Sequence, residues 1–115
     1  MRIAVLGALS SKEDTERTSS KVVVDYIKNV HRMCEIASTL RKKGWHPFVP
    51  ALDLLLGIVG GNWDEEDYRG LTTAFIPVCD AVLVISDSWG TQKDIETAKF
   101  HGVKVYYSLE EVPNE

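Results

Sequence analysis

The sequence predicts an α/β fold, with one three-layer domain built around a parallel sheet of four to five strands. The first observation is that short uninterrupted apolar runs, such as Ile3–Leu6 and Ala81–Ile85, have the composition of strands covered on both faces. The second is that helical patterns separate these runs, in the order β-α-β-α-β-α-β. Such alternation is typical of parallel strands joined by right-handed crossovers.

Length and charge restrict the class of protein. The 115 residues, 44% of them hydrophobic, are enough for one domain spanning residues 1–115. The net charge of −4 argues against a nucleic-acid partner, because such proteins usually present a basic face to phosphates. The most apolar run, residues 52–59, is too short to cross a membrane and contains Asp53. We expect a cytoplasmic protein without a signal peptide, with Cys34 and Cys79 reduced and in the core.

The first half of the chain predicts two strands, one long helix and a loop. The strand Ile3–Leu6 ends at Gly7, and the polar segment from Ser10 to Ser20 indicates a long mobile loop. A helix is expected from Val24 to Lys43, before Gly44. Its apolar positions recur every three or four residues: Ile27, Val30, Cys34, Ala37 and Leu40. Two prolines in the second strand, His46–Pro50, favour an edge position.

The second half predicts two helices and two strands. Leu54–Gly61 is apolar and ends in two glycines, which indicates a pliable connector. The acidic segment 62–67 is typical of a helix start. After the strand Ala81–Ile85, a helix from about Asp94 to His101 is closed by Gly102 and leads to the strand Val103–Tyr107. The acidic tail, residues 110–115, is expected to fray.

The turn after Ala81–Ile85 is the most informative segment for function. In α/β proteins, a turn between the carboxyl end of a parallel strand and a helix start is a common ligand site, because backbone N–H groups converge there. Here the segment from Ser88 to Ala98 follows the strand and also carries the carboxylate of Asp94.

Three blocks together resemble the nucleoside 2-deoxyribosyltransferase superfamily, including its small phage and bacterial members and the deoxynucleotide N-glycoside hydrolases. The first is Gly7-Ala8-Leu9-Ser10. The second is Asn29 with the helix running into Gly44-Trp45-His46-Pro47-Phe48-Val49-Pro50. The third is Cys79-Asp80-Ala81 to Ile85, followed by Ser88-x-Gly90-Thr91-x-x-Asp94-Ile95-x-x-Ala98-x-x-x-Gly102-x-x-Val105.

The resemblance implies a flavodoxin- or Rossmann-like domain and chemistry at an N-glycosidic carbon, without a metal or redox cofactor. A carboxylate attacks the anomeric carbon, the base leaves, and water or another base resolves the glycosyl-enzyme. The position of the family's nucleophile is Asp94, where the family usually has Glu. The resemblance further implies that Ser88, Gly90 and Thr91 hold a 5′-phosphate. Gly7, Ser10, Asn29 and Asp67 are the other expected substrate-binding residues, and the loop from Ala8 to Ser20 would close over the base.

Two departures from the family keep a second interpretation open. Asp is one methylene shorter than Glu, and Leu9 stands where many transferases of the group have Tyr. The first interpretation is an enzyme that cleaves or transfers the N-glycosidic bond of a (deoxy)nucleoside or its 5′-monophosphate. The alternative is a non-catalytic nucleotide-binding or sensing module on the same fold.

Individual residues also have structural interpretations. Thr91 and Asp94 have the spacing of a helix capping box. Ser88 fits a turn, Asn29 fits a buried polar contact, and Asp64 and Asp67 fit helix-start charges. Trp63 and Trp89 fit either stacking on a base or packing. The apolar segment Leu54–Val59 predicts a homo-oligomer, because a small sheet cannot cover it.

Overall fold

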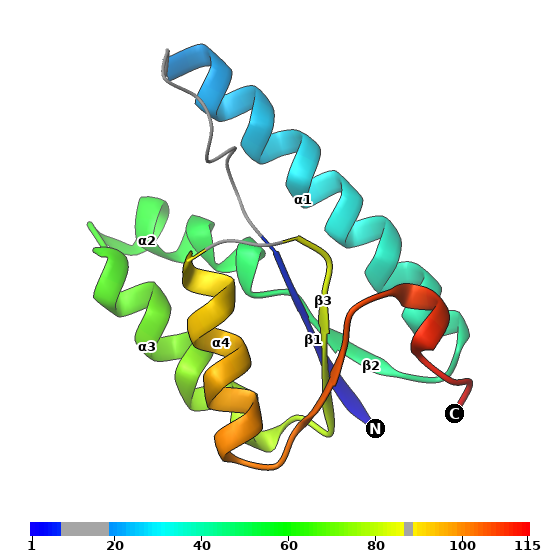
Figure 1. The fold of residues 1–115 in the computed structure, drawn as a ribbon. Coiled ribbons are helices and arrows are strands. Elements are labelled where there is room, and N and C mark those ends of the chain that lie inside the picture. The colour runs from blue at the N-terminus through cyan, green and yellow to red at the C-terminus, as the bar shows by residue number, and fades with distance from the viewer. Residues whose placement is uncertain (8–18, 87–88) are drawn as a thin grey trace.

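The computed structural model of the chain describes residues 1–7, 19–86 and 89–115 and contains one all-parallel sheet. Its strands are β1 (Arg2–Leu6), β2 (His46–Phe48), β3 (Ala81–Val84) and β4 (Lys104–Tyr106). The order across the sheet is β2-β1-β3-β4 (Figure 1). The predicted parallel α/β sheet is therefore confirmed, and β2 lies at an edge as its prolines indicated.

Helices cover both faces of this sheet. The α-helices are α1 (Ser19–Lys42), α2 (Leu54–Gly60), α3 (Glu65–Phe75) and α4 (Trp89–Phe100). The 3-10 turns are η1 (Pro50–Asp53), η2 (Ile76–Val78) and η3 (Leu109–Glu111). Helix α1 and η3 lie on one face, while α3, η2 and α4 lie on the other (Figure 1). The molecule thus has the three layers of a flavodoxin-like fold.

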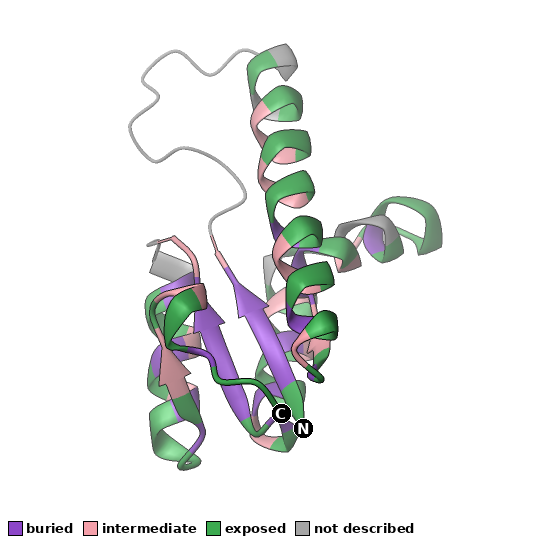
Figure 2. Ribbon diagram, turned by 90° about the vertical axis from the view of Figure 1, so that its right-hand side faces the viewer, coloured by how far each residue is buried: buried purple, intermediate pink, exposed green. Residues whose placement is uncertain are grey.

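Successive side chains of a strand point to opposite faces of the sheet, and each face has its own apolar core. Ile3 and Val5 of β1 pack with Met33 and Leu40 of α1. Ala4 and Leu6 point the opposite way and pack with Ala98 of α4 and Ile76 of η2, among others. Both faces of β1 and β3 are consequently buried, and the two strands form the purple centre of Figure 2. This explains why their sequences are uninterrupted apolar runs.

The connections reverse direction between β1 and β3. The chain passes from β1 through α1 to β2 on one side, and from β3 through α4 to β4 on the other. In open α/β sheets the crevice outside the carboxyl ends of such a strand pair is the usual ligand site. The architecture therefore points to the region just after Leu6 and Val84.

Helix α1 is longer than its apolar pattern indicated. It begins at Ser19, five residues before the predicted start, so the expected loop ends earlier than Ser20. The core-facing side runs through Met33 and Leu40, with Val30 and Ala37 packed against the core. Cys34 is exposed, which corrects its predicted core position, while Cys79 is buried as expected. The reason is that successive residues of a helix are rotated by about 100°, so Cys34 lies on the flank of α1 when Met33 points into the core.

Residues 54–60 form helix α2, so the predicted pliable connector is wrong. Glycine ends the helix rather than loosening it, because Gly61 adopts the left-handed conformation with φ 119°. Gly57 lies against Tyr68 and Trp63, where a β-carbon would overlap their side chains. That close contact ties α2 to the start of α3.

The acidic tail is docked, which corrects the predicted fraying. Val112 is 1% exposed and belongs to the core on the α1 face. The indole N–H of Trp45 donates to Pro113 O at 2.8 Å, and the Glu115 N–H donates to Lys43 O at 2.7 Å. The prediction considered only the acidic residues of the tail, whereas the tail is held by the burial of Val112.

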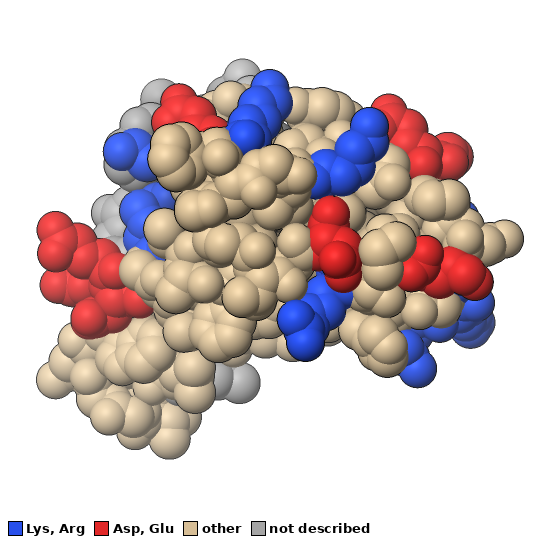
Figure 3. Space-filling view, turned by 90° about the horizontal axis from the view of Figure 1, so that it is seen from below, with Lys and Arg blue, Asp and Glu red and all other residues tan. Residues whose placement is uncertain are grey.

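The described part of the surface carries charged side chains of both signs (Figure 3). On the face seen in Figure 3, Lys and Arg side chains are interspersed with Asp and Glu side chains among the described residues. Within residues 1–7, 19–86 and 89–115, no helix is long and apolar enough to cross a membrane.

Candidate functional site

The candidate site begins where β1 and β3 end together. The two strands stay paired past their last residues, because the Ile85 N–H donates to Leu6 O at 2.9 Å. A guanidinium N–H of Arg32 on α1 reaches Ile85 O at 3.5 Å from the other layer. These two hydrogen bonds hold the segment after β3 against β1 and against α1.

Gly7 is placed at this edge and leaves no room for a side chain. A β-carbon there would lie 2.8 Å from Ile85 Cγ1, 2.9 Å from Ser86 Oγ and 3.0 Å from Met33 Cε. Only glycine allows β1, α1 and the segment after β3 to approach so closely. The structure thus brings Gly7 and Ser86 together at the switch point, and Ser86 was not among the predicted site residues.

Asp94 lies on α4, in the helix that follows this edge. Its carboxyl is half-buried, and burial raises its pKa from 3.8 to about 6, against the opposing effect of the Arg69 guanidinium. Removal from water penalises the charged form, and the nearby positive charge offsets that penalty only in part. A strongly perturbed carboxyl on the helix that follows the carboxyl edge of a sheet marks a candidate functional group.

Arg69 of α3 supplies the positive charge that opposes the rise in the pKa of Asp94, and the sequence did not single it out. It is half-buried and lies on a helix that packs on α4. The available signal was that Arg69 is the one basic residue in the sequence of α3. Its partner became evident only when α3 and α4 were seen side by side, because 25 residues separate Arg69 from Asp94.

The capping-box interpretation places Thr91 just before the first turn of the helix, whereas the helix begins before Thr91. Helix α4 begins at Trp89, so Thr91 is already its third residue and Asp94 its sixth. Thr91 is only 3% exposed and packs inside the first turn. Gly90 also lies in that turn. Ser10 and Ser88, with the rest of the expected loop from Ala8 to Thr18, lie outside the described residues.

Asp67 serves the start of α3. Its carboxylate accepts from the Asp64 N–H at 2.9 Å, and the Asp64 carboxylate accepts from the Asp67 N–H at 2.9 Å. This reciprocal pair is a capping box, and both residues are exposed. The structural interpretation of Asp64 and Asp67 as helix-start charges is confirmed, and it assigns the Asp67 carboxylate a partner within the protein.

Asn29 occupies the face of α1 that turns toward the sheet. It is half-buried and lies one helical turn before Met33, the residue that touches the Gly7 position. Since α1 runs back from the carboxyl edge, that turn is closer to the edge than Met33 is. Asn29 is therefore near the switch point, on the layer opposite Asp94.

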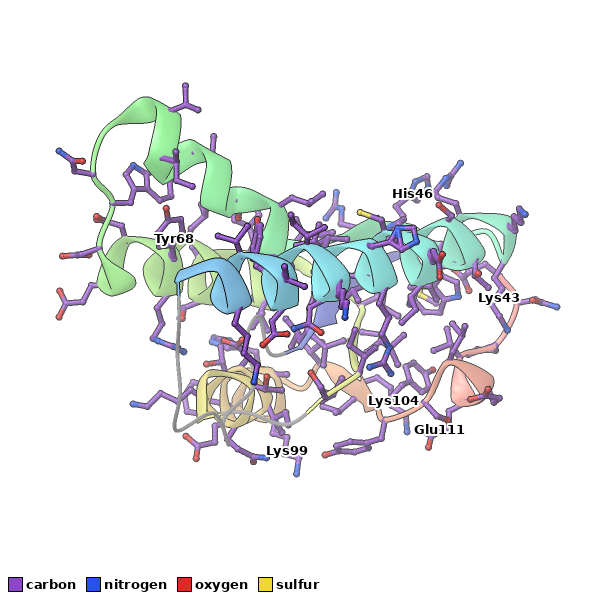
Figure 4. All side chains as sticks on the ribbon, turned by 90° about the horizontal axis from the view of Figure 1, so that it is seen from above. Lys43, His46, Tyr68, Lys99, Lys104 and Glu111 are labelled. Carbon is purple, nitrogen blue, oxygen red and sulfur yellow. The ribbon has the colours of Figure 1, made fainter. Side chains whose placement is uncertain are left out.

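A second group of polar and aromatic side chains gathers beside α2. The Tyr26 hydroxyl donates to Ala51 O at 3.2 Å, and burial raises its pKa, with smaller contributions from Tyr68 and Cys34. The Tyr68 ring also packs against the Trp63 ring in a tilted arrangement, with ring centroids 5.3 Å apart. Figure 4 shows Tyr68 near the α2 end of the molecule. Trp63 is thus a packing partner of Tyr68, as its structural interpretation predicted.

Asp53 joins this group at the start of α2. Burial raises its pKa, and its Oδ2 atom is buried without a hydrogen-bond partner among the described residues. The sequence gives no local signal for this carboxylate, because Asp53 stands alone between Leu52 and Leu54 without a recognisable motif.

The site as described offers a partly desolvated carboxylate, a neighbouring guanidinium and a close backbone approach at the end of β1. A carboxylate in such a place suits nucleophilic or acid-base chemistry, and the edge beside it suits a polar ligand. Comparisons with protein-family models, with curated proteins and with solved structures found no match to this chain.

Proposed function

We propose that the protein cleaves or transfers the N-glycosidic bond of a (deoxy)nucleoside or its 5′-monophosphate, with Asp94 as the nucleophile. The observation that carries the proposal is the Asp94 carboxyl itself, half-buried on α4 and close to Arg69. With a pKa of about 6, this group is mostly ionised at neutral pH although it is partly removed from water. A poorly hydrated carboxylate of this kind is a suitable attacking group.

The reaction has two displacements. An Asp94 carboxylate oxygen attacks the anomeric carbon, and the C–N bond breaks with its electron pair leaving on the base, which takes up a proton. The resulting glycosyl ester is attacked by water, or by a second base, and the carboxylate is released unchanged. Arg69 keeps the free carboxylate ionised, because its positive charge lowers the pKa of Asp94.

The direct test is base release from a panel of nucleosides, 2′-deoxynucleosides and their 5′-monophosphates, followed by chromatography. The wild-type protein should release free base from at least one substrate, and Asp94→Asn should release none. Glu96→Gln is the matched control, because Glu96 is an exposed carboxylate two residues farther along α4. Base release retained by folded Asp94→Asn would overturn the mechanism.

The alternative is a nucleotide-binding module without turnover, and the Asp in place of the family's usual Glu favours it. Thermal shift separates the two functions. A binding module would be stabilised by a nucleotide that it leaves intact, because ligand binding to the folded state raises the melting temperature. If the turn around Ser88 and Gly90 holds a phosphate, a 5′-monophosphate should raise the melting temperature more than the matching nucleoside, and Ser88→Ala should reduce that difference.

A further inference from the structure

Helix α2 is apolar on every side, yet most of it is exposed. Its sequence is Leu-Leu-Leu-Gly-Ile-Val-Gly, without a polar side chain. Val59 is 82% exposed, and Ile58 and Leu56 are also exposed. Figure 3 shows the corresponding corner of the molecule as a projecting lobe without charged side chains. A helix that is hydrophobic all round is normally buried, whereas the described residues of the chain leave Leu56, Ile58 and Val59 exposed.

The first half of α1 also exposes large apolar side chains. Val23, Val24 and Ile27 are about half exposed or more. Val23 lies five full turns before Arg41, hence on the same flank of α1. Arg41 donates to Trp45 O at 2.9 Å, immediately before β2, so this flank faces the β2 edge. Arg32, on the opposite flank, instead reaches Ile85 O beside β3.

The β2 edge is where η1 and α2 begin. The Tyr26 hydroxyl bonds to Ala51 O, which joins α1 directly to η1. Helix α2 and the first half of α1 lie at the same end of the molecule in Figures 1 and 4. We name this region the α1–α2 surface and define it by its large exposed apolar residues: Val23, Val24, Ile27, Leu52, Leu56, Ile58 and Val59.

We propose that a second copy of this chain covers the α1–α2 surface in a symmetric homodimer. The exposed parts of the seven side chains sum to roughly 350 Å² of apolar area, taking about 90 Å² for each fully exposed aliphatic side chain. A standard interface buries about 800 Å² on each partner, of which somewhat more than half is apolar. The surface therefore supplies most of the apolar area that a stable dimer requires.

A second copy fits better than a lipid surface. Interfacial membrane helices combine their apolar face with many basic residues, which attract anionic headgroups. The α2 segment has no basic residue, and the chain has a net charge of −4. A symmetric dimer uses each apolar residue twice, once on each copy, and its partner is always present at the same concentration.

The dimer would border the candidate site but does not depend on the proposed function. Both parts of the surface are joined to carboxyl ends of strands, since η1 and α2 follow β2 and the start of α1 lies at the β1 end. A partner on the α1–α2 surface therefore lies at the same edge of the sheet as Gly7 and Asp94. Assembly and catalysis can be tested separately, because none of the seven residues is assigned to the chemistry.

The test is the molar mass of the full chain in solution at micromolar concentration, by light scattering and sedimentation equilibrium. The wild-type protein should have twice the 12.9 kDa mass of one chain. Val59→Glu and Ile27→Glu should each reduce the mass to that of one chain. Phe100→Glu is the matched control, since Phe100 is 85% exposed on α4, away from the α1–α2 surface, and this variant should stay dimeric.

Val59→Ser supplies a milder variant in case a buried charge perturbs folding, and it should weaken dimerisation while circular dichroism remains unchanged. A wild-type protein that stays monomeric overturns the proposal, whether or not it binds anionic lipid vesicles. So does a dimer that persists in both glutamate variants, because the contact would then lie elsewhere on the molecule.

Discussion

Burial of the Asp94 carboxylate lowers the free energy of unfolding at neutral pH, and a role as the nucleophile would explain why the residue is kept there. An ordinary aspartate is fully ionised well below neutral pH, whereas burial raises the pKa of this carboxyl to about 6. The unfolded chain has a pKa near 3.8 at this position, so between these two values the folded protein binds more protons than the unfolded one. The contribution of Asp94 to stability therefore falls as the pH rises from about 4 to 6 and stays at its lowest at pH 7.

Asp94→Asn should accordingly stabilise the protein at pH 7 while it abolishes base release. The expected gain in the free energy of unfolding is about 1–2 kcal/mol, after allowance for the solvent contact that the carboxyl retains. The gain should shrink as the pH falls below about 6 and disappear below 3.8, because the wild-type carboxyl is then protonated in both states. Urea unfolding at several pH values measures it, with Glu96→Gln as the control. A loss of stability at pH 7 would indicate that Asp94 has a structural role instead.

Gly7 gives a second prediction at the scale of one residue. Gly7→Ala should lower the free energy of unfolding by about 1–3 kcal/mol, because the added carbon overlaps Ile85, Ser86 and Met33 in a packed region. Gly70→Ala in α3 is the matched control. A β-carbon at Gly70 meets no atom within 4 Å, so this change should stabilise the helix by about 0.5–1 kcal/mol. Equal effects of the two changes in urea unfolding would contradict the close packing at Gly7.

Among the elements, α3 has the clearest start signal, and the sequence contained it. Asp64→Ala should lower the free energy of unfolding by about 0.5–2 kcal/mol, because the carboxylate that caps the first turn is lost. Asp67→Ala should have a similar but smaller effect and leave the KM for any substrate unchanged. Glu66→Ala, at an exposed neighbour, is the control. A higher KM with unchanged stability would instead support Asp67 as a substrate-binding residue.

Elements were predictable where local chemistry determines them. The apolar runs of β1 and β3, the capping carboxylates of α3 and the glycines at 44 and 102 act within a few residues, and each led to a correct element. Helix α2 was misread because an apolar segment without polar positions has no detectable helical period. Its helix is fixed by the contact of Gly57 with Tyr68, which no local pattern reveals.

At the scale of the whole molecule, some candidate site residues have a local signal in the sequence and others depend on contacts with distant residues. Gly7 and Asp94 were identifiable because they follow strands in the sequence, and the parallel order brings the carboxyl ends of those strands to one edge. The effect of Arg69 on Asp94 and the approach of Ser86 to Gly7 each join residues that are distant in sequence, so no local pattern reveals them. The helix start considered at Thr91 was placed too late, since α4 starts at Trp89.

The docked tail provides the last prediction, because it closes the core from the far end of the chain. Val112 is 1% exposed and packs in the core cluster that contains Trp45 and Leu40, on the α1 face of the sheet. Val112→Ala should lower the free energy of unfolding by about 1–3 kcal/mol, through lost burial and the cavity left behind. For a chain of this size that corresponds to a decrease of several degrees in melting temperature.

Asn114→Ala is the matched control, since Asn114 is exposed two residues farther along, and it should leave the melting temperature unchanged. A fraying tail predicts the opposite pattern, with neither change having an effect. If Val112→Ala melts at the wild-type temperature, the contacts of Pro113 with Trp45 and of Glu115 with Lys43 do not hold the tail in solution. A lower melting temperature for Val112→Ala, with none for Asn114→Ala, would show that the tail packs with α1 against this face of the sheet in solution.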